Sequence, residues 1–414
     1  MAKIQKIQAR SIFDSRGIPS VEVDLYLKTG EWGRFSTPSG ASCGSKEALE
    51  LRDQDETRYR GKGVSKAIAH IHGEISEALL GSEDFNQQAL DECLIKLDGT
   101  PNKSRLGANA ILPVSGAFFH AMAQLNNQPL YGKGVRLPMP MINVINGGSH
   151  ANNGLNVQEF MIVPKGATSF SEAMRMASEV FQVLKSTLND RALSTAVGDE
   201  GGFAPALANN EEALQLLMIS CEKAGYQPGK DIYFALDVAA SELLSQEKNC
   251  YHMNNEWLSR ADLLQWYKKL SDQFPIISIE DPFGENDYQG FIEITKTLGT
   301  KVQIVGDDLF VTNERYIKEG IENSYANAVL IKMNQIGTMS ETLRSIELAQ
   351  SGGMKTIISH RSGETEDTTI ADLAVLTHAG QIKTGSMSRS ERIAKYNRLL
   401  RIEEMLGDNA VFGN

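Results

Sequence analysis

Residues 232–237 (Ile-Tyr-Phe-Ala-Leu-Asp) open the stretch that decides the fold, which continues to Ser386. This stretch contains six short apolar segments, and each of them ends on a charged or polar residue. The six end residues are Asp237, Glu280, Asp307, Lys332, His360 and Lys383. After the first interval they recur about every 25 residues, which is the length that one strand, one helix and two short loops require.

This repeat predicts parallel strands that alternate with helices. Segments so short and so apolar suit strands that are buried on both faces of a parallel sheet. Functional groups that stand at the carboxyl ends of the strands are typical of a (β/α) barrel, whose active site lies at that end. The alternative is a doubly wound open sheet with incidental charges at the strand ends. Six charged or polar ends in succession favour the barrel.

Two more strands are expected ahead of the repeat, at 141–145 and 156–163, with only a Gly/Asn-rich loop between them. Because no helix fits into that loop, the two strands should pair antiparallel. Two helices should follow, one that opens with the capping box Ser169-Phe-Ser-Glu172 and one over 210–224. The expected fold is therefore a TIM-like α/β barrel with the element order ββαα(βα)6.

The first part of the chain shows a different pattern. Residues 21–27 alternate apolar and polar side chains ahead of the turn Thr29-Gly30, which predicts an antiparallel hairpin. Helical patterns follow at 45–55, 64–80, 86–97 and 108–126. An antiparallel sheet followed by helices predicts an α+β domain. A Pro- and Gly-rich stretch then places the domain boundary between an N-terminal capping domain, 1–130, and a catalytic barrel, 131–414.

Composition limits the class of protein. The chain has 414 residues, of which 41% are hydrophobic and 22% charged, as expected for a globular enzyme of two domains. The formal net charge of −11 argues against general nucleic-acid binding and against an anionic membrane as partner. Four scattered cysteines indicate neither a zinc site nor a disulfide framework. With no signal peptide and no run of membrane-spanning length, a cytoplasmic location is expected.

Three of the strand ends carry carboxylates, namely Asp237, Glu280 and Asp307. Neighbouring barrel strands lie about 4.8 Å apart, so these carboxylates should converge, and a cation would relieve their repulsion. Oxygen ligands without Cys or His favour Mg²⁺ over zinc. The alternative for any one of them is a helix cap or a surface ion pair.

The remaining strand ends supply basic groups. A lysine that faces a mouth lined by metal and other cations should have a lowered pKa, so we expect Lys332 to be a competent base. The alternative is that it pairs with a carboxylate. Arg361-Ser362 beside Gly363 suits a phosphate or a carboxylate. Glu159 and Glu200 offer acids from the first half of the barrel, opposite the lysines, as an anti elimination requires.

Two loops rich in small residues, 38–42 and 147–154, are expected to act as lids that close over the site and exclude water.

With these residues in view, the chain resembles the enolase family over essentially its whole length. The most specific matching segments are Asp14-Ser-Arg-Gly17, Pro38-Ser-Gly-Ala-Ser42, Gly198-Asp-Glu-Gly-Gly202, Leu330-Ile-Lys-Met-Asn-Gln-Ile-Gly337, Ser359-His-Arg-Ser-Gly-Glu-Thr-Glu-Asp367 and Gln381-Ile-Lys-Thr-Gly-Ser386. The resemblance implies dehydration of 2-phospho-D-glycerate to phosphoenolpyruvate with two Mg²⁺ ions per active site. It also implies a homo-oligomer, a dimer or higher.

Position by position, the resemblance implies roles for the residues of the site. A lysine base that works with Mg²⁺ is the established chemistry of this superfamily, and Lys332 would take the C2 proton. Glu200, helped by Glu159, would protonate the departing C3 hydroxyl. The first Mg²⁺ would lie on Asp237, Glu280 and Asp307, and the second on Ser42 together with the substrate phosphate. The implied substrate contacts are His150, Gln158, Glu159, Lys332, His360, Arg361, Ser362 and Lys383.

Within that set, Lys383 would hold the substrate carboxylate, and Arg361 with Ser362 would hold the phosphate. The sequence departs from the family pattern at Ile18, Ser20, Cys43, Pro113 and Gly284, and none of these departures removes a catalytic group.

Two alternatives remain. Another branch of the superfamily, such as a mandelate-racemase-like or muconate-cycloisomerase-like enzyme, would carry a Lys-x-Lys base on an early barrel strand, and no such motif stands there. A scaffold or binding protein, such as an RNA-decay partner or a surface adhesin, would be expected to have lost a metal or lysine position. All of these positions are intact, although such a secondary role could coexist with catalysis.

Overall fold

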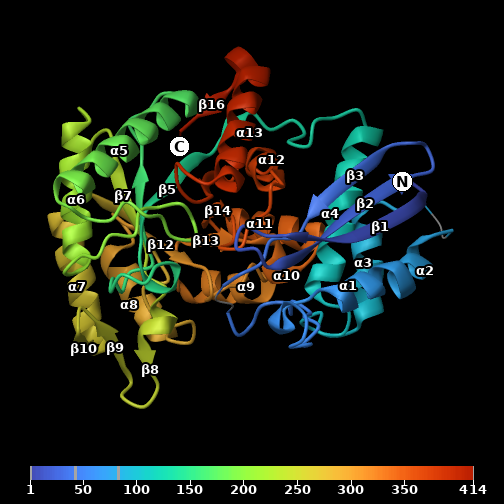
Figure 1. Cartoon of the computed structure of the whole chain (residues 1–414), viewed down its shortest axis with the longest axis horizontal. Helices are drawn as coiled ribbons and strands as arrows, with labels where there is room; N and C mark the ends of the chain where they lie inside the picture. Colours follow the sequence, from blue (N-terminus) through green and yellow to red (C-terminus); the bar gives the residue numbers. More distant parts are fainter. Residues whose placement is uncertain (1, 42–43, 82–83, 414) are drawn as a thin grey trace.

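The computed structural model describes residues 2–41, 44–81 and 84–413. A closed eight-stranded barrel forms its larger part (Figure 1). In chain order its strands are β5 (Met139–Asn146), β6 (Glu159–Val163), β7 (Tyr233–Asp237), β11 (Ile276–Glu280), β12 (Gln303–Gly306), β13 (Ala328–Ile331), β14 (Lys355–Ser359) and β15 (Gly380–Lys383). The barrel closes where β15 pairs with β5. This closure confirms the barrel and excludes the doubly wound open sheet.

Strand β6 is the antiparallel member of the barrel. It pairs antiparallel with β5 and with β7, whereas the other neighbours pair parallel. Two helices, α5 (Phe170–Asp190) and α6 (Asn210–Lys223), separate β6 from β7. The predicted order ββαα(βα)6 is therefore confirmed.

Helices follow each of the last six strands, as the repeat predicts. They include α7 (Arg260–Gln273), α8 (Tyr288–Leu298), α9 (Glu314–Asn323), α10 (Met333–Ile336), α11 (Met339–Ser351), α12 (Thr369–Leu376) and α13 (Ser390–Leu406). Side-chain caps begin several of the barrel helices. At α5 the Ser169 hydroxyl accepts a hydrogen bond from the Glu172 N–H. The Thr338 hydroxyl does the same for the Glu341 N–H at α11.

An α+β domain precedes the barrel, as predicted. Its antiparallel sheet has the order β1 (Ile4–Phe13), β2 (Pro19–Leu27), β3 (Trp32–Ser36). Its helical elements include α1 (Ser65–His70), a π-helical turn at Ile71–Ile75, α2 (Ser76–Leu79), α3 (Gln87–Asp98) and α4 (Ala108–Leu125). Helix α4 packs against the sheet at Gly116, where an added Cβ would lie 2.4 Å from the Phe35 ring. Pro113 lies in the second turn of α4 without ending the helix.

The predicted helix over 45–55 is wrong. That segment is a loop whose backbone N–H groups bond to distant partners instead of to each other. Ala48 donates to the Gln335 carbonyl (2.8 Å), and Leu49 donates to the Asn102 carbonyl (2.8 Å). These tertiary hydrogen bonds replace the helical ones. The segment is therefore extended and connects the two domains, although its sequence pattern is helical.

A small antiparallel sheet, β8 (Leu244–Ser245), β9 (Cys250–Met253) and β10 (Glu256–Leu258), is inserted after β7. A further parallel pair joins β4 (Arg136–Leu137) to β16 (Val411–Phe412). Across the described part of the chain, no helix combines the length and apolar character needed to cross a membrane.

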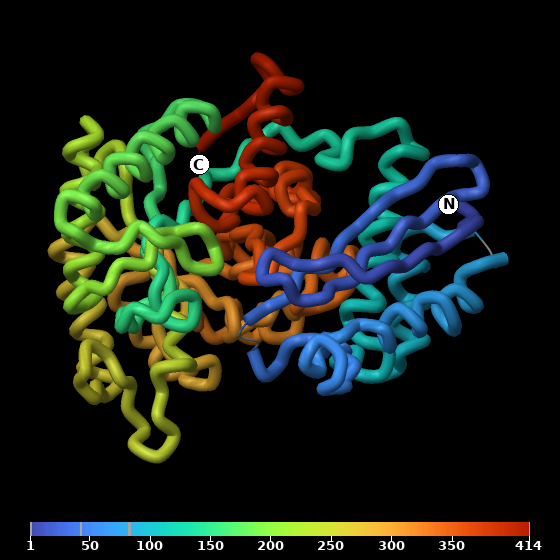
Figure 2. The backbone as a smooth tube through the Cα atoms, in the orientation of Figure 1, coloured from blue at the N-terminus to red at the C-terminus, as the bar shows by residue number. Residues whose placement is uncertain are grey.

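The N-terminal domain reaches the carboxyl end of the barrel through the loop after β3. Ser39 and Gly363 exchange two backbone hydrogen bonds of 2.8 Å, so this loop pairs with the segment after β14. Figure 2 shows the corresponding blue tube entering the barrel region. The capping domain therefore helps to wall the cavity at the barrel mouth.

Candidate active site

A narrow cavity with about 30 Å³ of free space lies at the carboxyl ends of the barrel strands. Except for Glu280 and Ser42, it is lined by every site residue expected from the sequence: His150, Gln158, Glu159, Glu200, Asp237, Asp307, Lys332, His360, Arg361, Ser362 and Lys383. Glu280 is buried and touches the lining residue Lys383. Ser42 lies outside the described residues. The fold therefore gathers residues that are up to 233 positions apart (150 to 383) around one small space.

One side of this cavity, here called the lysine side, consists of Lys332, Lys383, Asp237, Glu280 and Asp307. Lys383 Nζ lies 2.8 Å from Asp237 Oδ2 and 2.9 Å from Glu280 Oε2, and Lys332 forms an ion pair with Asp307. All five side chains are at least four-fifths buried. Here the lysines bridge carboxylates that the sequence assigned to a metal.

The expected lowering of the Lys332 pKa is wrong for this arrangement. Burial by itself would lower the pKa of Lys332, but the adjacent Asp307 carboxylate outweighs it and raises the pKa above its usual 10.5. The same contact lowers the pKa of Asp307, against the effect of its burial. Lys332 is therefore an ammonium ion here, as in the alternative of a carboxylate partner.

The lysine side holds three carboxyl groups but only two lysines, so ionising all three carboxyls would leave an excess of negative charge. Burial, and then repulsion from Asp237, hold the pKa of Glu280 well above its usual range. Its neighbour Asp281 is also buried, and burial with the charge of Asp308 raises its pKa well above the usual range. A divalent cation would relieve this excess.

Within the described residues, Asp281, Asp307 and Asp308 offer oxygen atoms within 4.8 Å of one another, whereas Asp237 and Glu280 hold Lys383. Buried carboxylate oxygens are ligands that suit Mg²⁺. The donor set of the lysine side thus fits a hard divalent cation, provided that the lysines give up some of their contacts.

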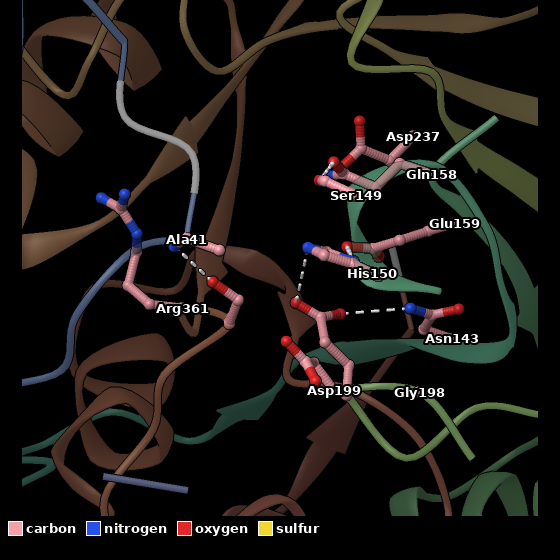
Figure 3. Close-up of polar contacts among 12 residues, drawn as sticks. Ala41, Asn143, Ser149, His150, Gln158, Glu159, Gly198, Asp199, Asp237 and Arg361 are labelled. Carbon is pink, nitrogen blue, oxygen red and sulfur yellow. Dashed lines mark hydrogen bonds and ion pairs between the residues drawn. The ribbon is translucent and has the colours of Figure 1, made fainter. Parts of the chain in front are cut away.

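The opposite side of the cavity, here called the glutamate side, consists of Glu159, Glu200, His150 and His360. The contacts of His150 are loose: its Nδ1 lies 3.6 Å from Glu159 Oε1, and its Nε2 lies 3.8 Å from Glu200 Oε1. Closer contacts join His360 Nε2 to Glu200 Oε2 (3.2 Å) and Lys383 Nζ to Glu159 Oε1 (3.3 Å). Asn143 Nδ2 donates to Glu200 Oε2 over 3.1 Å. Figure 3 shows Asn143, His150 and Glu159 on one side and Arg361 on the other. Distances of 3.6–3.8 Å are too long for hydrogen bonds, so these groups can accept a polar substrate atom between them.

The two glutamates of this side have opposite pKa shifts. Burial, and then repulsion from Glu200, hold the pKa of Glu159 well above its usual 4.5. Burial would also raise the pKa of Glu200, but His360 and His150 hold it well below that value. Burial lowers the pKa of His360 to about 4, so at neutral pH this ring acts on Glu200 as a neutral hydrogen-bonding group. Two neighbouring glutamates thus have pKa values shifted in opposite directions, an arrangement typical of acid and base pairs.

The phosphate-binding residues expected from the sequence face the capping domain. Arg361 Nη1 lies 2.9 Å from the Glu47 carboxylate and 3.2 Å from Asn334 Oδ1. The Ser362 hydroxyl accepts a hydrogen bond from the Ala41 N–H over 2.7 Å. Ser362 thus joins the described part of the 38–42 loop to the barrel, and Arg361 joins Glu47 of the capping domain to it.

Gln158 connects the lysine side of the cavity to the 147–154 loop. Its amide nitrogen donates to Asp237 Oδ2 over 3.2 Å, and its oxygen accepts from the Ser149 hydroxyl over 2.8 Å (Figure 3). The 147–154 loop, expected to act as the second lid, is thereby connected through Gln158 to the Asp237 carboxylate of the lysine side.

Sequence reasoning missed several residues that shape the site. Asp281 and Asp308 line the cavity directly after Glu280 and Asp307, and these doubled acids were a visible signal. Glu47, the partner of Arg361, lay in the segment that was predicted to be a helix. Arg392, which is fully buried against His360, gave no local signal because it stands in an ordinary helical pattern.

The fold and the site together define a (β/α)-barrel enzyme with buried carboxylates and lysines at the carboxyl ends of its strands. The model of the enolase N-terminal domain matches residues 4–133, and the model of the enolase C-terminal TIM barrel domain matches residues 134–414. The chain therefore belongs to the enolase family. Membership indicates a lyase that acts on a small-molecule substrate, in a family that generally uses Mg²⁺ and often forms oligomers.

Proposed function

We propose that the protein is a phosphopyruvate hydratase that dehydrates 2-phospho-D-glycerate to phosphoenolpyruvate with Mg²⁺. The observation that carries this proposal is the opposition of the two sides of the cavity. Lys332 lies in one enclosed space with Glu159, whose pKa is raised, and Glu200, whose pKa is lowered. A base and an acid on opposite faces of a substrate are what an anti elimination of water needs.

The chain's own residues would divide the work as follows. Lys332 is an ammonium ion beside Asp307, so it would first release one proton to solvent as that contact is given up. The neutral amine would then accept the C2 proton. Glu200 would receive a proton from Glu159 and transfer it to the departing C3 hydroxyl. His150 stands between these two glutamates, within 3.6–3.8 Å of each, and would orient that hydroxyl.

The other residues would bind and orient the substrate. Arg361 and Ser362 would hold the phosphate, with His360 behind them. Gln158 and Lys383 would hold the carboxylate end.

We place the first Mg²⁺ on Asp237, Glu280 and Asp307, and the second on Ser42 and the phosphate. Bound there, the two ions would neutralise the doubly charged aci-carboxylate that forms when the C2 proton leaves.

We also propose that the domain boundary lies at residue 130, and that the protein assembles as a homodimer or a higher homo-oligomer. Limited proteolysis would test the boundary, and light scattering would test the assembly.

A steady-state assay of phosphoenolpyruvate formation from 2-phosphoglycerate tests the proposed reaction. We expect turnover with Mg²⁺, loss of turnover with excess chelator and recovery when Mg²⁺ is restored. Absence of phosphoenolpyruvate from a folded, Mg²⁺-loaded sample would contradict the proposal and favour another reaction of the superfamily.

A further inference from the structure

Arg392 lies next to the glutamate side of the cavity, where His360 is the one site residue whose side chain it is shown to contact among the described residues. It stands at the start of α13 and is 0% exposed. Its Nη1 lies 2.6 Å from His360 Nδ1 and 2.5 Å from the Arg361 carbonyl, and its Nη2 lies 2.6 Å from the Ser362 carbonyl. One guanidinium therefore holds three consecutive residues at the end of β14.

The packing around this guanidinium leaves it little freedom. Gly385, whose φ is +80°, passes so close that an added Cβ would lie 2.8 Å from Arg392 Cδ and 2.9 Å from the Glu200 carbonyl. Weaker contacts join Nη2 to the Asp199 carbonyl (3.3 Å) and to the Ser15 hydroxyl (3.4 Å). The position of the guanidinium relative to His360 is therefore set by the fold.

This contact determines which nitrogen of His360 carries hydrogen. A guanidinium has five N–H donors and no acceptor, so the atom that it contacts must offer a lone pair. His360 Nδ1 is then unprotonated. The single hydrogen of a neutral imidazole must reside on Nε2, which lies 3.2 Å from Glu200 Oε2.

The Nδ1–H tautomer of His360 would create two unfavourable contacts. An N–H on Nδ1 would point at the donors of Arg392, and the lone pair of Nε2 would face the Glu200 carboxylate. That arrangement is tolerable only if Glu200 takes up a proton. The charged groups that face His360 are Arg392, Glu200 and Glu364, and Glu364 is itself paired with Lys395 at 2.9 Å.

We infer that Arg392 is a positioning residue, which holds His360 in the Nε2–H tautomer so that its N–H faces Glu200 Oε2 at 3.2 Å. The consequence for catalysis rests on the proposed function: Glu200 is kept as the ionised member of the glutamate pair and receives its proton from Glu159. The tautomer itself rests only on the geometry. By holding the carbonyls of Arg361 and Ser362, Arg392 also orients the segment proposed to bind the phosphate.

Nitrogen-15 NMR of the histidine side chains tests the inference in the full chain without any substrate. The sequence has seven histidines, and the His360→Gln variant identifies the His360 signals. We expect a single Nε2–H tautomer in the wild type and in Arg392→Lys, which keeps a donor. Arg392→Met, which removes the donors at similar length, should show a substantial Nδ1–H population. A wild-type Nδ1–H tautomer, or an Arg392→Met ring unchanged from wild type, would overturn the inference.

A second comparison keeps the test decisive if Arg392→Met does not fold. The side-chain amide nitrogen of glutamine takes the place of Nε2, whereas that of asparagine takes the place of Nδ1. His360→Gln should therefore keep the donor to Glu200, and His360→Asn should lose it. Because a hydrogen bond to a charged group is at stake, we expect an unfolding equilibrium constant about ten-fold more favourable to the native state for His360→Gln. Equal stability, or a more stable His360→Asn, would count against the inference whether or not the protein makes phosphoenolpyruvate.

Discussion

The lysine side and the glutamate side of the cavity are both buried, but their charges are held differently. On the lysine side, Lys383 touches Asp237 and Glu280 at 2.8–2.9 Å. On the glutamate side, His150 stays 3.6–3.8 Å from Glu159 and Glu200. Every ammonium of the first side is engaged with a carboxylate, whereas the second side has buried atoms without a hydrogen-bond partner, among them His150 Nδ1 and Glu159 Oε2.

This difference indicates that the lysine side must rearrange before catalysis, whereas the glutamate side is already arranged for a substrate group. An unpartnered buried polar atom is costly unless a ligand satisfies it, so the glutamate side is arranged for a substrate group. On the lysine side the contacts must be exchanged before Lys332 can act as a base. Since only about 30 Å³ is free, binding of substrate must also move side chains or the docked loop over 38–42.

The largest expected effect is at Lys332. Lys332→Ala should lower kcat at least about 10³-fold, because general-base catalysis contributes on the order of 10²–10⁴-fold. The other lysine of the cavity, Lys383, is held by three carboxylates and cannot replace it. Phosphoenolpyruvate formation measures the loss, and calorimetry should show that Mg²⁺ and substrate still bind. Lys355→Ala, at the exposed opposite end of β14, is the matched control. Normal turnover by Lys332→Ala would break the assignment of the lysine side.

The next effect is on stability. Lys383→Met should lower the free energy of unfolding by about 3–5 kcal/mol in the presence of chelator, because it leaves Asp237, Glu280 and Glu159 without their cation. Added Mg²⁺ should restore part of the loss by replacing that charge. Urea unfolding with and without Mg²⁺ measures the loss of unfolding free energy and its recovery. If the loss is the same in both conditions, these carboxylates do not bind the metal.

The glutamates should affect stability in opposite directions. Because the pKa of Glu159 is raised above 4.5 in the folded protein, the native state holds its proton more tightly, and stability is lost as pH rises above that value. Glu159→Gln mimics the protonated carboxyl and should lose less stability than the wild type between about pH 5 and pH 8.

The pKa of Glu200 is lowered, so its contribution is fully present above 4.5 and is lost as pH falls through the lower folded value. Glu200→Gln should therefore be less stable than the wild type at neutral pH. Urea unfolding in chelator at several pH values distinguishes the two variants. Shifts of the same sign for both would contradict the division of charge between them.

The smallest effect is expected at the hydrogen bond between Ser149 and Gln158. Ser149→Ala removes one neutral hydrogen bond to Gln158, which is worth about 1 kcal/mol. We expect KM to rise by roughly five-fold with little change in kcat, because Gln158 is proposed to bind substrate and not to move a proton. Ser351→Ala, at an exposed helix end, is the control. A loss confined to kcat would place Gln158 in the chemistry instead.

Much of the fold could be predicted because it depends on local pattern. The recurrence of apolar segments every 25 residues or so located six of the barrel strands, and two apolar runs ahead of the repeat located the other two. The absence of a helix between 145 and 156 identified those two as the antiparallel pair. The prediction failed at 45–55, where the backbone bonds to Gln335 and Asn102. A helical pattern cannot reveal that distant carbonyls take the place of its own.

The membership of the cavity was also predictable, because strand ends meet at one mouth. The state of its residues was not. Lys332 was expected to be neutral, yet Asp307, 25 positions away in sequence, raises its pKa. Arg392 was missed because its contact with His360 joins α13 to the end of β14. Nothing in the sequence of either segment indicates that the two are in contact.

The order of residues along the chain therefore determined the barrel, its capping domain and the set of groups at its mouth, because apolar periodicity and the direction of parallel strands act locally. Only the tertiary structure decided which carboxylate each lysine contacts, which glutamate has the raised pKa and which nitrogen of His360 carries hydrogen. Charge interactions and hydrogen bonds depend on separations of a few ångströms through space. Such separations are set when all eight strands and both domains are packed together.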